Sequence, residues 1–107
     1  MNKKEYLERY IFIGLRDQNS GFDVSTIKYF SQDEFEIILS RIERYGLGIT
    51  GIEPWFDGEF HGVAIYEDYT SDPTDPTWYN TAFKEFVDSG KALQYSATYK
   101  VPDRLLK

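Results

Sequence analysis

The chain has 107 residues, no cysteine and a formal net charge of −6. This length suits one domain around a single core, and the lack of cysteine excludes disulfide frameworks, thiolate metal sites and cysteine nucleophiles. The acidic balance disfavours direct binding to nucleic acid or to an anionic membrane, because both need a basic surface. We therefore expect one soluble, cytoplasmic domain over residues 1–107.

The first apolar stretch of the chain, at residues 10–15, is too short for a signal-peptide core or a membrane span. The surrounding run RYIFIGLR, residues 9–16, is almost continuously apolar and predicts a strand. Residues 17–21 are turn-prone, and residues 22–30 predict a further strand.

The clearest local signal lies in SQDEFEIILSRIERYG, residues 31–46. Ser31 and Glu34 have the spacing of a capping box, and Gly46 is placed to end the helix in a left-handed conformation. The apolar residues between them recur at helical intervals, and they are Phe35, Ile38, Leu39, Ile42 and Tyr45.

Residues 26–46, which begin with TIKYFSQDEFE, resemble the strand-to-helix junction of the regulators of ribonuclease E activity of the B type. The resemblance implies a small acidic protein of ferredoxin-like fold that binds and restrains a nuclease. It covers about a fifth of the chain, and it assigns no functional residue. The last predicted strand carries Tyr95 and Tyr99 where a Gly-Trp pair is expected, and no long acidic tail is present.

A hairpin is predicted around Asp57-Gly58, a pair that suits a tight turn. It joins a strand at residues 47–56 to a strand at residues 59–69. Counting outward from the turn pairs Trp55 with Phe60, Glu53 with Gly62, Ile52 with Val63 and Ile49 with Tyr66. Pro54 cannot donate a ladder hydrogen bond, which indicates an edge strand near this end.

A second helix begins at Asp75, the expected cap, with Pro76 at its first position and Gly90 closing it. Its predicted inward residues are Ala82, Phe83, Phe86 and Val87. Residues 92–101 alternate apolar and polar side chains and predict a strand with one buried face. The order strand, helix, strand occurs twice, which predicts an α+β, two-layer ferredoxin-like sandwich with an antiparallel sheet of four or five strands and both helices on one face.

No catalytic, cofactor or metal motif is present. His61 has acidic neighbours but no second His or Cys and no nucleophile motif, so we expect it to be catalytically idle. Asp68, Asp72 and Asp75 lack the spacing of a calcium loop, and we expect Asp72 and Asp75 to cap turns and the helix. Gly46, Gly48 and Gly51 do not form a phosphate-binding loop. We therefore predict no enzyme activity, no cofactor and no metal.

The segment of residues 51–75 carries seven carboxylates and no Lys or Arg. Aromatic residues alternate with these acids, and a hairpin can bury only one side chain in two, so some rings should be exposed. Exposed rings surrounded by charge are typical of a binding surface. The predicted partner-binding residues are Glu53, Trp55, Phe56, Asp57, Glu59, Phe60, Tyr66, Glu67, Asp68 and Tyr69.

These features favour a non-catalytic protein that binds and modulates a basic protein partner, as an inhibitor, an immunity protein or an anti-defence factor. The basic partner could be a nuclease or another nucleic-acid enzyme. One alternative is an enzyme or small-ligand domain with a pocket between sheet and helices. Another is a nucleic-acid mimic that occupies the basic groove of a nuclease.

Overall fold

The structure is a computed structural model that describes residues 1–107. The helix expected after Ser31 is present as α2, Gln32–Tyr45. The Ser31 hydroxyl accepts a 3.3 Å hydrogen bond from the backbone N–H of Glu34, and Gly46 ends the helix with φ of 73°. The Glu34 carboxylate does not complete the capping box. Its two oxygens each accept a 3.2 Å hydrogen bond from the backbone N–H of Arg16 instead.

The second predicted helix is α3, Pro76–Val87. The Asp75 carboxylate accepts a 2.9 Å hydrogen bond from the backbone N–H of Thr77, as expected for its cap. Ala82 and Phe83 are buried as predicted, while Phe86 and Val87 are half-buried. The helix also buries Trp78 and Tyr79 in its first turn, which the inward face predicted from the sequence did not include.

Five strands form one sheet, in which every pairing is antiparallel. They are β1 Phe30–Ser31, β2 Gly48–Phe56, β3 Glu59–Phe60, β4 Ala64–Ile65 and β5 Gln94–Lys100. Their order is β1-β5-β2-β3, and β4 pairs with β2 as well. The α+β class and the antiparallel sheet are confirmed. The ferredoxin-like topology is not confirmed, because the first strand lies at the sheet edge.

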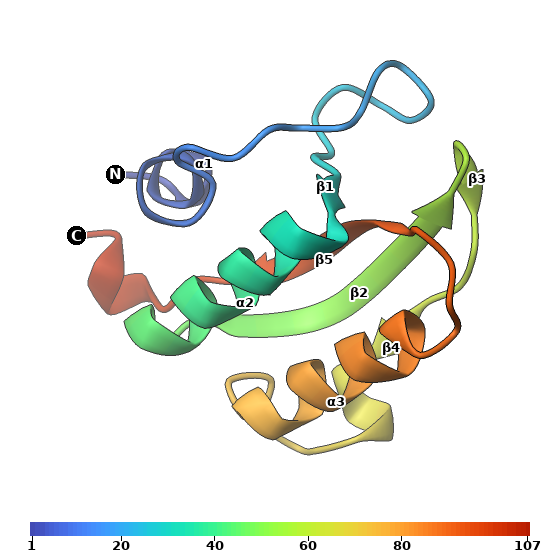
Figure 1. Cartoon of the computed structure of the whole chain (residues 1–107). Coiled ribbons are helices and arrows are strands. Elements are labelled where there is room, and N and C mark those ends of the chain that lie inside the picture. The colour runs from blue at the N-terminus through green and yellow to red at the C-terminus, as the bar shows by residue number, and fades with distance from the viewer.

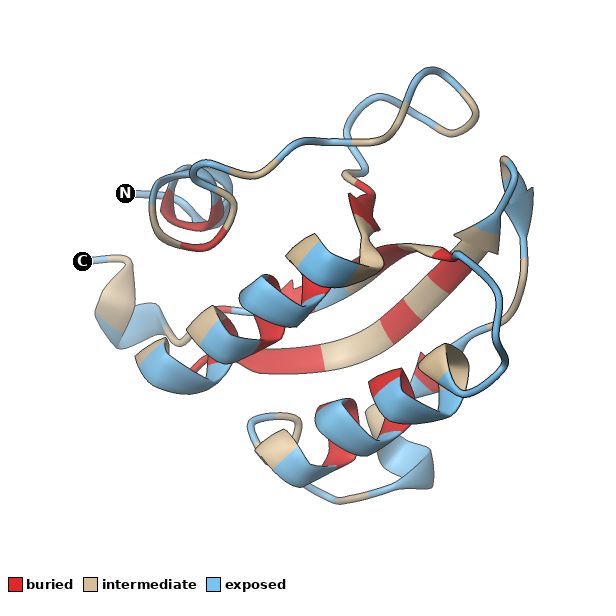
Figure 2. Cartoon of the chain, viewed as in Figure 1, coloured by how far each residue is buried: buried red, intermediate tan, exposed pale blue.

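Both long helices pack on the same side of the sheet (Figure 1). The rings of Phe35 in α2 and Phe83 in α3 each lie 5.1 Å from that of Tyr95 in β5, measured between centroids. Figure 2 shows the buried residues concentrated on β2, β5 and the inner faces of these helices. Six residues of the core predicted from the sequence are buried, namely Phe35, Leu39, Ile42, Phe83, Leu93 and Tyr95, while Phe86 is half-buried.

The strand predicted at residues 9–16 is wrong, because the N-terminus is helical. Helix α1, Lys3–Tyr6, continues as a π-helical turn over Leu7–Ile11. Asn2 and Glu5 cap it reciprocally, with a 2.8 Å hydrogen bond from the Glu5 backbone N–H to the Asn2 side chain. Tyr6, Leu7 and Ile11 are buried. No helix in the structure is long and apolar enough to span a membrane.

The strand predicted at residues 22–30 is also wrong, except for its last residue, Phe30, which begins β1. The preceding residues form an irregular loop that the side chain of Asn19 holds together. Its amide donates 2.9 Å hydrogen bonds to the carbonyl oxygens of Val24 and Ile27, and its oxygen accepts one of 3.1 Å from the N–H of Gly21. These local bonds replace the ladder bonds that a strand would make.

Candidate protein-binding surface

The tip of the hairpin agrees with the prediction. Asp57 and Gly58 have φ of 53° and 78°, the positive values that the tight turn requires. Trp55 is paired with Phe60, and the two rings meet edge to face with centroids 6.3 Å apart. Trp55 and Phe60 therefore lie on the same face of the sheet.

Beyond the tip, the predicted register is wrong by one residue. Ile52 is opposite Ala64, not Val63, and Gly51 is opposite Ile65. The backbone N–H of His61 donates a 3.0 Å hydrogen bond to the carbonyl oxygen of Pro54, and the chain then leaves the ladder until Ala64. A shift of one residue exchanges the two faces of a strand. The small residue Ala64 is buried as a result, whereas Val63 and Ile65 are exposed.

The shift creates a hollow of about 370 Å³ on the face of the sheet opposite the helices, which we call the acidic hollow. Its lining comes from β2, from the middle of β5, from Ile27 and from the segment between Val63 and Glu67. Neither α2 nor α3 contributes a residue. The hollow includes the carboxylates of Glu53 and Glu67 and no Lys or Arg. It is a shallow site that combines aliphatic and negatively charged side chains.

The aliphatic side chains of this face are unusually open to solvent. Val63 is 59% exposed and Ile65 is 39% exposed, and Phe60 at the edge of the same face is 57% exposed. Asp57 and Glu59 at the turn are also exposed. Contiguous exposed apolar groups rimmed by charge are characteristic of interaction sites. Val63 and Ile65 were absent from the predicted binding residues, because the assumed register placed Val63 opposite the buried Ile52.

Trp55 is less accessible than expected, because it belongs to a second aromatic cluster. Its ring lies 5.4 Å from the rings of both Phe22 and Tyr29 in the irregular loop. Its indole N–H donates a 3.3 Å hydrogen bond to the carboxylate of Glu53. Trp55 therefore fixes the loop and the Glu53 side chain, and Phe60 is the more open ring of the pair.

The other predicted aromatic residues lie away from the acidic hollow. Phe56 faces Lys91, whose ammonium is 5.2 Å from the ring centroid. The chain forms a short 3₁₀ turn at Tyr66–Asp68, and Tyr66 packs against the main core. Tyr69 is exposed, and its hydroxyl donates a 2.9 Å hydrogen bond to Glu85 of α3. Partial desolvation of the hydroxyl, together with this bond, raises the pKa of Tyr69. The predicted set is thus divided between the two faces of the sheet.

The residues weighed for catalysis or metal binding are not brought together. His61 is half-buried between β3 and β4, and no group of three His, Asp or Glu side chains is placed to hold a metal ion. The Asp72 carboxylate accepts hydrogen bonds of 2.9 Å and 2.7 Å from the backbone N–H and hydroxyl of Thr74. These bonds lower the pKa of Asp72. The expected turn-capping role of Asp72 is confirmed.

The chain matches no protein-family model, no curated protein and no solved structure.

Proposed function

We propose that this protein is a non-catalytic binder of a basic protein surface, and that the acidic hollow with the adjoining hairpin tip is its contact site. The observation that carries the proposal is the exposure of Val63 and Ile65 beside the carboxylates of Glu53 and Glu67, in a hollow lined by no Lys or Arg, with the exposed ring of Phe60 at the hairpin tip. Carboxylates accelerate the encounter with a basic partner, while apolar side chains that lose water on contact hold the complex.

The charge distribution supports the same assignment. Seven carboxylates without a balancing cation in residues 51–75 repel one another and disfavour the compact state. A basic partner would relieve this repulsion, and a nuclease is one such partner, as the resemblance at residues 26–46 implies. The contact residues we propose are Glu53, Asp57, Glu59, Phe60, Val63, Ile65 and Glu67.

The test compares matched variants on the two faces of the molecule. The immobilised protein is used to capture partners from a lysate of its source cells, and the captured proteins are identified by mass spectrometry. Ile65→Ser removes an aliphatic group from the acidic hollow, and its control is Ile37→Ser, because Ile37 is 43% exposed on α2. Glu67→Lys reverses a charge in the hollow, and Glu36→Lys reverses one on the exposed side of α2.

We expect a basic protein to be captured by the wild type and by both α2 controls, and to be lost with either hollow variant. Its retention should fall with rising salt, because exposed charges are screened. Equal capture by hollow variants and controls would place the contact site elsewhere. Failure of the wild type to retain any basic protein at low salt would contradict the proposed function itself.

A further inference from the structure

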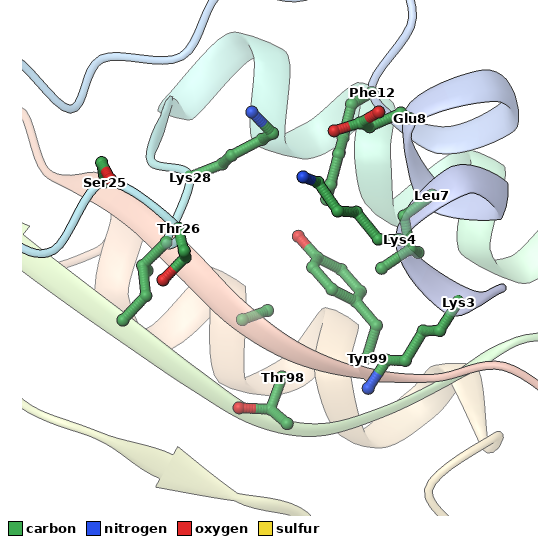
Figure 3. Close-up of a pocket in the computed structure, with 12 residues that line it drawn as sticks. Lys3, Lys4, Leu7, Glu8, Phe12, Ser25, Thr26, Lys28, Thr98 and Tyr99 are labelled. Carbon is green, nitrogen blue, oxygen red and sulfur yellow. The ribbon is translucent and has the colours of Figure 1, made fainter.

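A cavity of about 660 Å³ lies between the N-terminal helix, residues 25–28 and the end of β5 (Figure 3). We call it the lysine cavity. It forms because β1 covers only Gln94 and Tyr95 of β5, so the strand has no neighbour on that side from Ser96 onward. Its volume lies within the range of about 300–1,000 Å³ that small-molecule sites occupy.

The charge of this cavity is opposite to that of the whole chain. Lys3, Lys4 and Lys28 line it, against the single carboxylate of Glu8. The only side-chain ion pair in the structure joins Lys84 to Asp88, so none of these three lysines is paired. In a chain with 18 acidic residues, three unpaired ammonium groups around one cavity favour an anionic ligand.

Tyr99 supplies an independent observation. It is 7% exposed, its hydroxyl is buried without a hydrogen-bond partner, and Figure 3 shows the side chain rising from β5 into the space between Lys4 and Thr26. Two other tyrosine hydroxyls are buried without a partner, those of Tyr79 and Tyr95, but neither lines this cavity. Buried hydroxyls are normally hydrogen-bonded, so the Tyr99 hydroxyl is a donor available to a ligand.

The remaining wall combines the hydroxyl residues Ser25, Thr26 and Thr98 with apolar side chains, one of them aromatic. Leu7 and Phe12 line the cavity, and the Phe12 ring meets that of Tyr99 edge to face with centroids 5.5 Å apart. Figure 3 shows Lys4 beside Tyr99, and the flexible stem of a lysine allows its ammonium group to move when a ligand enters. The cavity therefore combines cations, hydroxyl groups and a surface for a flat apolar group.

We propose that the lysine cavity binds a phosphate monoester that carries an aromatic body. The phosphate group is held by Lys3, Lys4 and Lys28, and one of its oxygens accepts a hydrogen bond from Tyr99. The aromatic body packs on Leu7 and Phe12. Three cations match a doubly charged phosphate group better than a single carboxylate. The lysine cavity adjoins the acidic hollow and shares Ile27, Ala97 and Thr98 with it, but the charged residues of the two sites are different, so the proposal does not depend on the protein-binding function.

The test is a titration of the isotope-labelled full chain, followed by NMR amide shifts, with naphthyl phosphate as the probe. Inorganic phosphate supplies the headgroup alone, naphthol the aromatic body alone, and octyl phosphate the same headgroup on an aliphatic body. We expect naphthyl phosphate to shift the amides of Leu7, Phe12 and Tyr99, which line only the lysine cavity, and to bind at least about tenfold more tightly than the other three. Shifts elsewhere, or none, would overturn the site. Equal binding of naphthol or octyl phosphate would overturn the assigned ligand class.

Matched variants locate the contacts. Lys4→Gln, Lys28→Gln and Tyr99→Phe should each lower the affinity for naphthyl phosphate about tenfold. Each removes a hydrogen bond to a charged group, and such bonds are stronger than those between neutral groups. Lys84→Gln removes a cation from the far side of the molecule and should leave the affinity unchanged. Tyr99→Phe should not lower the thermal midpoint of the free protein, since it removes an unpartnered hydroxyl. Unchanged affinity in all three cavity variants would overturn the proposal.

Discussion

The guanidinium of Arg41 in α2 donates a 2.8 Å hydrogen bond to the backbone carbonyl oxygen of Ile11, at the end of the N-terminal helix. A second bond of 2.8 Å goes to the carbonyl oxygen of Ile13. The last carbonyl groups of a helix have no hydrogen-bond partner within it. The Arg41 side chain therefore supplies a donor to two carbonyl oxygens that would otherwise lack one. Arg41 thus fastens the N-terminal segment to the rest of the fold.

Arg41→Ala should therefore loosen the N-terminal segment more than the rest of the molecule. We expect amide hydrogen exchange to accelerate over residues 7–13, and the free energy of unfolding to fall by about 1–3 kcal/mol. The control is Arg9→Ala, since the Arg9 side chain is exposed and makes no hydrogen bond. Equal exchange in the two variants would show that packing alone holds the segment.

Leu39→Ala tests the buried face of α2. Leu39 is 2% exposed, so its truncation should leave a cavity and cost about 2–5 kcal/mol in denaturant unfolding. Ile37→Ala on the same helix is the matched control, because Ile37 is 43% exposed. Its cost should stay below about 1 kcal/mol. A loss below that value for Leu39→Ala would contradict the assigned helix face.

The turn of the hairpin offers a comparison between two glycines. Gly58 has φ of 78°, a conformation that costs an alanine roughly 1–2 kcal/mol. Gly62 has no such φ, and an added Cβ there would lie 3.8 Å from Phe86, an ordinary contact distance. Gly58→Ala should lower the free energy of unfolding by that amount, whereas Gly62→Ala should change it by less than about 0.5 kcal/mol. Equal effects would contradict the assigned turn.

Trp55 and Phe60 are paired across the hairpin, but they should contribute differently to the stability of the fold. Trp55→Ala should cost roughly 2–4 kcal/mol of stability, because the ring holds Phe22 and Tyr29 of the loop. Phe60→Ala should cost less than about 1 kcal/mol, since that ring is 57% exposed. Once a partner is known, Phe60→Ala should mainly accelerate dissociation, as measured by surface-binding kinetics. Similar unfolding costs for both variants would show that the loop is not anchored by Trp55.

Alkaline pH should destabilise the fold. Burial raises the pKa of Tyr95 to about 12 and that of Tyr79 and Tyr99 further. The native state therefore keeps phenol protons that the unfolded chain loses above its ordinary pKa of about 10, and stability must fall as the pH rises from about 10 to 12. Denaturant unfolding across this range measures how steeply the free energy of unfolding falls with pH. Tyr95→Phe should make this slope shallower. An identical slope in Tyr95→Phe would contradict this account.

The sequence predicted the elements that local capping signals specify. Ser31 and Asp75 marked the starts of both long helices, and Asp57-Gly58 marked the hairpin turn. The N-terminal helix carries the same kind of signal in Asn2 and Glu5, but the apolar run after it suggested a strand. The hairpin register is wrong beyond the turn, and so is the edge position predicted from Pro54. Strand β2 lies between β5 and its other partners, β3 and β4, and Pro54 is opposite Tyr95. No local pattern indicates that Ala64, and not Val63, is buried opposite Ile52.

The lysine cavity could not be predicted, because its cations come from distant parts of the chain. Lys3 and Lys4 lie on the N-terminal helix, Lys28 on the irregular loop and Tyr99 on β5. The sequence carries no spacing that joins them. They meet only because β1 stops after two residues and leaves space beside β5.

The central place of β5 has a consequence for the order in which the molecule can form during its synthesis. β5 lies between β1 and β2, so neither of those strands has its main partner until residues 94–100 have left the ribosome. A nascent chain that ends at Gly90 contains both long helices but only the hairpin ladders of β2. Folding of the sheet must therefore wait for β5, and it closes contacts that are distant in the chain, which slows it. A chain ended at Gly90 should lack cooperative unfolding.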